Sequence, residues 1–462
     1  MTDQTTITFS PEKELAALPS TKDPVFGSLA SGVALTFATR LLVLGGVIGS
    51  SVIVGRWLGP AGMGALAVLN VTVALALQLG SAGLPSAITY FIAKDRSTLG
   101  TAWVNSIVFA LVVGTIIGVT VVTLEEMKPD LFAGVSTRLI AIVAISIPFQ
   151  LFTLLGLNML LAIDRIRLMN LMDSLSSVFV FANAITVLVI WQRKLMALVS
   201  FNTVAAILVS LLLIWVVGRL PAQQKQRDPR RPNLPLLKRM LGYGLKFYLS
   251  ILASVVIFRA DLLIVNRFRG ANEAGVYAVA TQFSLLLTML PGVIATLLFP
   301  RVASRQDETA EYTVEVTRHA SFVMLIICLG AAAASFALPM VYGHRFADAT
   351  IQLLILLPGI FLISIESVLV QHFTGTGLPA IIPVFWIVTM IVNLGLNIAL
   401  VPTRGARAAA VNSTVSYALI FVLVTAYFCQ KTGRRPLEVF LLRRYEFRDL
   451  FTKFRRRAFA SR

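Results

Sequence analysis

Charged residues are scarce in this chain of 462 residues, at 13% of the total, whereas 57% of the residues are hydrophobic. Soluble globular domains carry roughly 25% charged residues. The apolar residues also come in blocks, close to the ~20 residues that a helix needs to cross a bilayer. The shortage of charge excludes an ordinary soluble fold, and the blocks indicate an all-α membrane protein.

Cysteine and histidine are rarer still, with two and three copies. Cys328 and Cys429 lie in or beside apolar blocks and no histidine has ligand spacing, so we expect neither a disulfide framework nor a metal site. The sequence has no G-x-x-x-x-G-K-[ST] phosphate loop, which argues against ATP hydrolysis. The loop acids Glu125, Glu126 and Asp130 have no partner histidine. We therefore expect no enzyme activity and no cofactor other than a coupling ion, H⁺ or Na⁺.

The apolar blocks predict about twelve transmembrane helices in two bundles of six around a central cavity. Helices are expected because a helix satisfies its own backbone hydrogen bonds in lipid. The predicted spans are residues 28–55, 64–93, 101–123, 137–162, 167–191, 195–218, 239–266, 275–300, 317–342, 349–372, 379–402 and 405–429. The predicted domains are a disordered leader (1–27), an N-terminal half (28–219), a basic linker (220–238), a C-terminal half (239–429) and a basic tail (430–462).

Basic residues set the predicted orientation. The net charge is +18, and Lys and Arg concentrate between Arg219 and Arg239 and from Lys431 to the C-terminus. Clusters beside spans follow the positive-inside rule and attract anionic lipid headgroups. We therefore expect cytoplasmic N- and C-termini, an even number of spans and no nucleic-acid partner.

A short repeat relates the two halves. The segment from Arg56 to Val68 aligns without a gap on the segment from Arg267 to Val279, and both have the form R-x-x-G-x-x-x-x-G-x-x-A-V. Each copy follows the first span of its half, which favours a parallel duplication over chance similarity between glycine-rich turns. Two bundles related in this way can rock against each other and open a cavity to each side of the membrane in turn. The basic, proline-bearing linker suits a tether between them.

These residues resemble a known family. The segment from Arg56 to Val68, the run from Leu84 to Lys94 and the block from Phe258 to Ala280 are similar to the polysaccharide-transporter group, which includes the Wzx-type oligosaccharide flippases. This group belongs to the multidrug/oligosaccharidyl-lipid/polysaccharide exporter superfamily. The resemblance covers about residues 28–430. It implies a bacterial inner-membrane flippase that moves a polyprenyl-diphosphate-linked oligosaccharide outward for exopolysaccharide, O-antigen or capsule synthesis. A polysaccharide polymerase and chain-length proteins are the partners it suggests.

Two other functions stay open. A MATE-like cation-coupled drug exporter would favour carboxylates and aromatics over arginines in its cavity. A membrane polysaccharide polymerase or glycosyltransferase usually carries its catalytic residues on a long extracytoplasmic loop, and the loops predicted here are short.

Three basic residues within spans, Arg40, Arg259 and Lys246, are candidates for binding an anionic headgroup. A charge at a helix centre costs about 2.5–3.5 kcal/mol and rarely faces lipid. Arg40 either lines the cavity or pairs with a buried carboxylate. Arg259 suits a diphosphate because its planar fork makes bidentate bonds to phosphate oxygens. Lys246 either joins it or extends toward the cytoplasmic interface.

Three acids within spans, Glu366, Asp261 and Asp173, are candidates for ion coupling, and all three are expected to be buried. Glu366 ranks first because its neighbours are apolar, and such carboxyls serve as proton relays in transporters. The alternative is a structural acid held by hydrogen bonds or an arginine. Asp261 and Arg259 are two residues apart on one helix, so they are not expected to pair.

Helix-breaking residues mark candidate gate kinks. Gly80, Gly83 and Pro85 interrupt the second predicted span, and Pro291 interrupts the eighth. Proline removes a backbone hydrogen bond, and nearby glycine lets neighbouring helices approach. These positions are either flexing points or irregularities that membrane helices tolerate.

The tail combines phenylalanines with arginines between residues 437 and 459, at spacings that place an apolar stripe on one helical face. This pattern predicts an interfacial helix on the anionic cytoplasmic leaflet. A plain basic anchor beside the last span is the alternative.

Overall fold

The computed structural model describes residues 24–220, 231–289, 291, 302, 309–377 and 379–440, and within these ranges the side chains of residues 24–42, 246 and 247 are left undescribed. All regular structure in these ranges is helical, and nine helices are long and apolar enough to cross a membrane. The expected all-α, multi-pass membrane protein is confirmed.

The N-terminal half contains six α-helices and three short helical turns. They are α2 (Pro24–Ser81), α3 (Leu84–Lys94), η1 (Arg96–Thr98), α4 (Leu99–Met127), η2 (Pro129–Phe132), α5 (Thr137–Ala162), α6 (Ile166–Ala184), the π-helical η3 (Ile185–Ile190) and α7 (Leu195–Arg219). The C-terminal half contains α8 (Leu234–Leu287), α10 (Glu311–Ser335), α11 (Leu338–Tyr342), η5 (His344–Phe346), α12 (Ala347–Thr376), α13 (Ile381–Thr432) and α14 (Pro436–Phe440). Because α8 begins at Leu234, helix starts inside the predicted linker (220–238).

Three of these helices are kinked at a glycine with positive φ. Gly59 in α2, Gly270 in α8 and Gly405 in α13 have φ of 67°, 82° and 68°. Glycine adopts this conformation at no steric cost. A straight helix with the 52 residues of α13 would be about 78 Å long, against a hydrocarbon core of about 30 Å. If each kinked helix supplies two spans, the described residues contain the predicted twelve.

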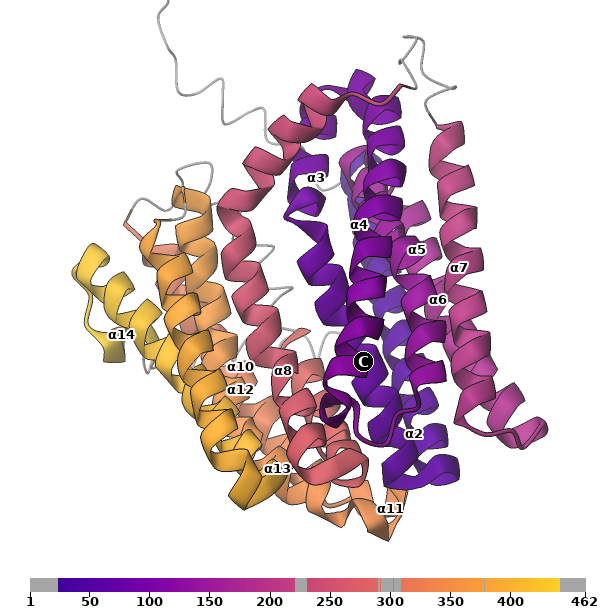
Figure 1. Cartoon of the computed structure of the whole chain (residues 1–462). Helices are drawn as coiled ribbons and strands as arrows, with labels where there is room; N and C mark the ends of the chain where they lie inside the picture. Colours follow the sequence, from indigo (N-terminus) through magenta and orange to yellow (C-terminus); the bar gives the residue numbers. More distant parts are fainter. Residues whose placement is uncertain are drawn as a thin grey trace, which may run out of the picture.

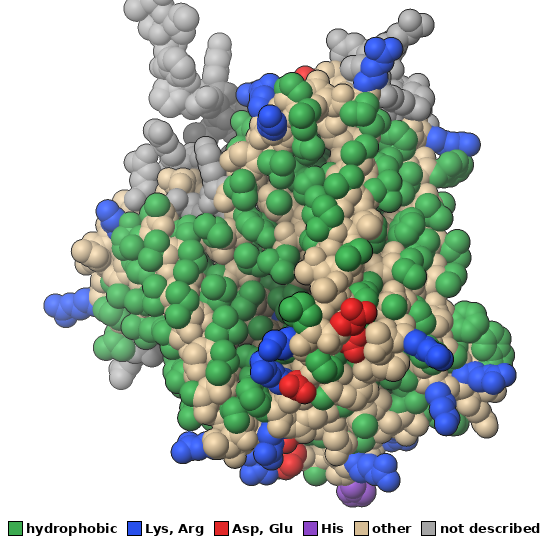
Figure 2. All heavy atoms as spheres, viewed as in Figure 1, with side chains coloured by type: hydrophobic (Ala, Val, Ile, Leu, Met, Phe, Trp, Pro, Cys, Tyr) green, Lys and Arg blue, Asp and Glu red, His purple; other side chains and the backbone are tan. Residues whose placement is uncertain are grey.

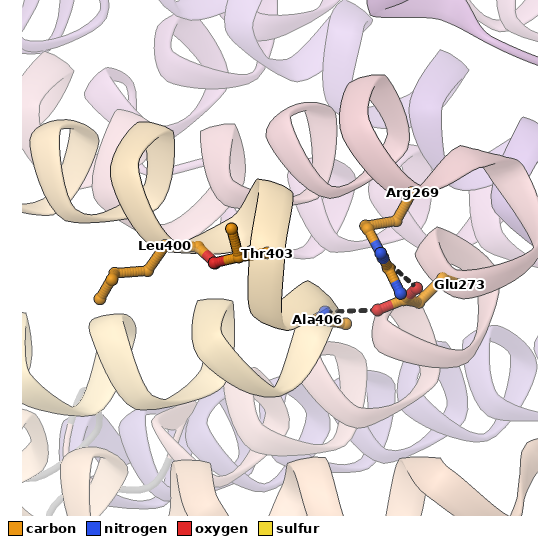
Figure 3. A network of polar contacts seen from close by, with 5 residues as sticks. All are labelled: Arg269, Glu273, Leu400, Thr403 and Ala406. Atoms are coloured by element: carbon orange, nitrogen blue, oxygen red, sulfur yellow. Dashed lines mark hydrogen bonds and ion pairs between the residues drawn. The ribbon is translucent and has the colours of Figure 1, made fainter.

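The kink in α13 is held by a carboxylate from α8. Glu273 accepts a hydrogen bond from the backbone N–H of Ala406 at 2.6 Å and an ion-pair contact from Arg269 Nε at 2.9 Å (Figure 3). A side chain at Gly405 would meet the Glu273 carboxylate, since a Cβ there would lie 2.1 Å from Oε1. Glu273 therefore caps the helical segment that starts after Gly405 and fixes α13 against α8.

The two halves lie side by side, with α2 to α7 on one side and α10 to α14 on the other, and α8 runs between them (Figure 1). The end of the molecule at which α11 lies is called here the α11 end, and the opposite end, where residues 220 and 231 flank the linker, the linker end. Contacts between the halves are made chiefly by α8, with α11 and η5 adding contacts to α2. Helix α8 is therefore a wall that the two halves share.

Among the described residues, the apolar core that joins α2 with α11, η5 and α12 lies at the α11 end. One buried cluster there joins Val54 of α2 with Tyr277 of α8 and Phe346 of η5. Toward the linker end, a second cluster around Phe152 belongs to the N-terminal half with Met240 of α8, and a third around Trp386 belongs to the C-terminal half. Burial of shared apolar surface therefore holds α2 against the C-terminal helices at the α11 end. Toward the linker end, only α8 among the described helices of the C-terminal half contributes to the core of the N-terminal half.

The outer surface is mostly apolar. Hydrophobic side chains cover the middle of the face shown in Figure 2, and Lys and Arg side chains gather toward its two ends. Exposed Leu, Ile, Val and Phe side chains occur along α4, α6, α7 and α10. Such a belt between two charged ends is what a bilayer solvates.

Candidate functional site

Arg56 ties the two halves together at the α11 end. This residue lies near the kink of α2, and its guanidinium donates to the carbonyl of Val341 at 2.6 Å and to that of Met340 at 2.8 Å. Both carbonyls belong to α11, where the last carbonyls of a helix have no partner within the helix. A cation at a helix C-terminus is also favoured by the helix dipole. Arg56 is therefore a contact between the halves that must break if the α11 end opens.

Ser51 forms a second contact between the halves, one turn deeper in α2. Its hydroxyl donates to Gln282 Oε1 of α8 at 2.9 Å and lies 3.0 Å from the hydroxyl of Tyr342 in α11. Tyr342 is 2% exposed and packs against Gly55, where a Cβ would lie 2.7 Å from its ring. These three side chains close the space between the halves behind Arg56.

The glycines of the two repeat segments are in direct backbone contact. A Cβ on Gly64 would lie 1.8 Å from the carbonyl oxygen of Ala271, and a Cβ on Gly275 would lie 1.9 Å from the carbonyl oxygen of Pro60. These distances leave no room for a side chain. Gly64 and Gly275 hold the same position in the sequence repeat, and the two helices meet there reciprocally, as a pseudo-two-fold arrangement requires.

The predicted interruption of the second span is a helix break. The chain has positive φ at Ala82 and Gly83, and Pro85 lies in the first turn of α3. A Cβ on Gly83 would lie 2.4 Å from the carbonyl oxygen of Gly244 in α8. The Tyr248 hydroxyl donates to the carbonyls of Gln78 and Leu79, at 3.2 and 2.9 Å, just before the break. The break therefore also serves as the docking point for α8.

The other predicted kink residues differ in what surrounds them. Gly80 is buried inside α2, where a Cβ would lie 2.8 Å from Ile117. Pro291 is helical, but most of its neighbours in the sequence lie outside the described residues. The use of these positions as gate hinges stays a prediction.

A cavity of about 450 Å³ lies within the N-terminal half, between α2, α5, α6 and α7. Gln282 of α8 completes its wall from the other half. Its polar lining consists of amides and hydroxyls, among them Asn70, Gln150 and Asn202, and none of the described residues that line it is charged. None of the three predicted basic residues is among the described lining residues, and the side chains of Arg40 and Lys246 are not described, so the cationic cavity stays a prediction.

Arg259 and Asp261 point to different sides of α8, as expected. Asp261 is 2% exposed and accepts hydrogen bonds from the Tyr277 hydroxyl at 2.5 Å and from the Ser413 hydroxyl of α13 at 3.1 Å. Arg259, two residues earlier, is exposed and forms no hydrogen bond or ion pair within the described part of the chain. Residues two apart lie about 200° apart around a helix, so the two side chains form no ion pair, although Arg259 is near enough to Asp261 and to Tyr417 of α13 to interact electrostatically.

The other candidate acids differ in burial. Glu366 is 2% exposed in α12, and its Oε1 has no hydrogen-bond partner among the described residues. Asp173 in α6 is partly exposed and takes part in a polar interaction. The expectation that Asp173 is buried is therefore wrong. It fails because α6 is largely surface-exposed, which its apolar sequence does not reveal in a membrane protein.

Three predictions fall on residues that lack a description. Arg40 lies in α2 and Lys246 in α8, but neither side chain is described. The predicted amphipathic tail helix lies outside the described residues except for α14. Their roles in headgroup binding and lipid contact stay predictions.

Several amide side chains lie within the apolar blocks, and five of them occur in two settings. Gln150 and Gln282 line the cavity. Asn393, Asn397 and Asn412 form a buried chain of hydrogen bonds within α13, next to Ser413 and Asp261. Sequence reasoning missed Ser51, Asn70, Asn202, Tyr248 and Tyr342 altogether. Only the R-x-x-G repeat pointed toward that region.

The fold and these contacts define a multi-pass membrane protein of the transporter type, with two helical halves closed against each other at one end. Residues 29–306 match the model of the polysaccharide biosynthesis protein family. The chain belongs to this family, and the predicted resemblance is confirmed.

Two curated relatives have functions in glycan synthesis. The succinoglycan biosynthesis transport protein ExoT of Rhizobium meliloti (strain 1021) is 24% identical over 347 residues, which are 72% of this chain and 66% of ExoT. The probable low-salt glycan biosynthesis flippase Agl15 of Haloferax volcanii is 20% identical over 221 residues, 46% of each chain. The matched regions span less than two thirds of either relative.

Two solved structures share the fold. The lipid II flippase MurJ in an inward closed conformation superposes with a TM-score of 0.70, at 14% identity and over 89% of each chain. An inward-facing MATE family multidrug transporter superposes with a TM-score of 0.68, at 16% identity, over 85% of this chain and 94% of that one. At such identities the likeness establishes the fold.

Proposed function

We propose that this protein moves a polyprenyl-diphosphate-linked oligosaccharide from the cytoplasmic to the outer leaflet of a bacterial inner membrane, by alternating access. The oligosaccharide would serve the synthesis of an exopolysaccharide, O-antigen or capsule. Membership in the polysaccharide biosynthesis family supports this substrate class. So do the names of two relatives, a succinoglycan transport protein and a glycan biosynthesis flippase.

The observation that carries the proposal is the one-sided closure of the halves. A single apolar core and the Arg56 and Ser51 contacts join them at the α11 end. Toward the linker end, α2 to α7 and α10 to α14 belong to different cores, to both of which α8 contributes. Rocking about the shared wall α8 would exchange these two states. With both termini and the linker cytoplasmic, as the basic residues predict, the closed α11 end faces outward and the protein awaits cargo from the cytoplasm.

Arg259 is the described cation best suited to the diphosphate. It lies in a span, is exposed and forms no ion pair within the described ranges. Its guanidinium is therefore available to phosphate oxygens, with which it can form paired charge-assisted hydrogen bonds. Arg40 and Lys246 remain proposed companions at the same headgroup.

Replacing Arg259 with alanine is expected to slow transport at least tenfold, because hydrogen bonds to a charged group contribute about 1.5–3 kcal/mol each. The assay follows a labelled undecaprenyl-diphosphate oligosaccharide across sealed liposomes that contain the full chain. Arg267→Ala, on the same helix and in contact with the Phe268 ring, is the matched control and should transport normally. If wild type moves no such lipid but exports a cationic dye, the flippase function is wrong.

We further propose that Glu366 couples transport to an ion gradient. A buried carboxylate without partners is costly, so this group should gain and lose a proton, or bind Na⁺, as its surroundings change. Asp261, by contrast, already accepts hydrogen bonds from Tyr277, Ser413 and the N–H of Leu262. Asp261 is the weaker candidate, since its carboxylate is satisfied in place, and Asp173 is weaker still because of its exposure.

Glu366→Gln is expected to keep basal transport and to lose the response to an imposed proton or sodium gradient. Glutamine has nearly the same shape but cannot ionise. Asp261→Asn, whose amide oxygen can still accept from Tyr277, should keep the gradient response. Transport rates of both variants are measured in liposomes with and without each gradient. A Glu366→Gln protein that responds like wild type would exclude Glu366 as the coupling group.

A drug exporter is the second candidate function, because the MATE structure shares the fold over most of the chain. It is less well supported, since the described lining of the cavity in the N-terminal half contains no carboxylate that would attract an organic cation. A polysaccharide polymerase and chain-length proteins are proposed partners in the membrane, and anionic lipid is the proposed contact of the tail.

A further inference from the structure

The cavity in the N-terminal half is lined by uncharged hydrogen-bonding groups set among apolar ones. Asn70, Gln150 and Asn202 provide amides, Ser50 and Thr203 provide hydroxyls, and the rest of the wall is aliphatic apart from further such groups. Its volume of about 450 Å³ lies within the range of about 300–1,000 Å³ typical of small-ligand sites. A purely lipid-filled space would need none of these polar groups.

The charge of the lining restricts what the cavity can hold. Since none of the lining residues that the structure describes is charged, a carboxylate or ammonium entering this part of the cavity would lose its hydration without gaining a counter-ion from them, which is costly. A polyol pays no such cost, because amides and hydroxyls replace the water bound to its hydroxyls. Its C–H faces match the aliphatic wall.

Several of the amides keep unused hydrogen-bonding capacity. Asn70 is exposed to the cavity and forms no hydrogen bond within the described part of the chain. Gln150 uses Nε2 to donate to Ser146 at 2.7 Å, and Asn202 uses Oδ1 to accept from Asn183 at 2.6 Å. Gln150 and Asn202 therefore each have one atom of the amide group held by a hydrogen bond and the other atom available to a ligand.

We propose that this cavity is a binding site for uncharged sugar residues of the lipid-linked oligosaccharide, separate from the headgroup site at Arg259. This inference rests on the proposed function. Neutral sugars enter the N-terminal half while the diphosphate stays beside α8.

The contact between Ser51 and Gln282 gives the cavity a route for release. Gln282 belongs to α8, and its Oε1 accepts from Ser51 across the boundary between the halves. When the halves part at the α11 end, this hydrogen bond breaks and the cavity loses the side chain that completes its wall. The bound sugar is then exposed to the outer side.

The test measures binding to the full chain in lipid nanodiscs, with three probes. They are undecaprenyl diphosphate alone, the same lipid carrying a neutral oligosaccharide, and the same lipid carrying an oligosaccharide with a uronic acid. Wild type should bind the neutral conjugate more tightly than the bare lipid, and the uronate conjugate at least tenfold more weakly than the neutral one.

Asn70→Leu and Gln150→Leu should each weaken binding of the neutral conjugate about fivefold, the equivalent of one neutral hydrogen bond, and leave the bare lipid unaffected. Asn158→Leu is the matched control, because Asn158 lies two turns from Gln150 on α5 and does not line the cavity. It should change neither affinity.

The outcomes separate this inference from the proposed function. If wild type transports the conjugate and the two cavity variants bind it normally, the sugar site is wrong and the flippase function stands. Equal weakening of the conjugate and the bare lipid would indicate structural damage and would also overturn the sugar site. Tight binding of the uronate conjugate would refute the restriction to neutral sugars. Failure of wild type to bind any probe would overturn both proposals.

Discussion

Alanine in place of Gly64 is expected to prevent closure of the α11 end. Its Cβ would lie 1.8 Å from the carbonyl oxygen of Ala271, and neither backbone can move without separating α2 from α8. Overpacking of this kind costs about 3 kcal/mol, which corresponds to a change of more than 100-fold in the closed population. The protein should shift toward an outward-open state and lose transport.

The readout is the labelling rate of a cysteine placed at Val54, which is 1% exposed at this end, in a chain whose two native cysteines are replaced. A membrane-impermeant maleimide added outside should react at least tenfold faster in Gly64→Ala. Gly45→Ala is the control on the same helix, because nothing lies within 4 Å of a Cβ there. Equal labelling of all three proteins would show that Gly64 does not control closure.

Removal of the Arg56 guanidinium is expected to open the α11 end in a smaller fraction of the molecules than Gly64→Ala does. Arg56→Ala loses two hydrogen bonds to the carbonyls of Met340 and Val341. Because the side chain is exposed, water replaces part of the loss, and we expect about 1–2 kcal/mol or roughly tenfold more open protein. The Val54 cysteine should label correspondingly faster, and transport should slow without a change in substrate affinity.

The repeat supplies the matched control for Arg56. Arg267 holds the equivalent position in the second segment, yet its described contact is with the ring of Phe268 rather than with the other half. Arg267→Ala should therefore label like wild type. If the two variants behave alike, the effect comes from loss of charge and not from the contact with α11.

The sequence located several functional positions correctly because their signals are local. Gly59 and Gly270 were visible as a repeated glycine, and both adopt positive φ at a kink. Gly83 and Pro85 were visible as an interruption of an apolar block, and the helix breaks there. In each case the residue type itself acts on the backbone, because glycine permits a positive φ and proline removes a helical hydrogen bond.

The sequence did not reveal the partners of these positions. Arg56 was visible as the first residue of the repeat, but its partners are a pair of carbonyls 285 and 284 residues away along the chain. Any residue carries a carbonyl, so no side-chain pattern marks this site. Likewise, Asp173 and Asp261 both lie in apolar blocks of the sequence, but Asp173 is partly exposed, whereas Asp261 is buried between α8 and α13.

Composition and local residue pattern by themselves determined that this is a helical membrane protein, where its helices bend, and to which family its segments are similar. The tertiary structure alone decided which end of the two halves is closed, and that the described lining of the cavity in the N-terminal half is uncharged. The reason lies in the solvent. In water, an apolar stripe marks the face of a helix that packs inward. In lipid, the outward face is apolar too, so the sequence does not separate the side chains that face a cavity from those that face the bilayer.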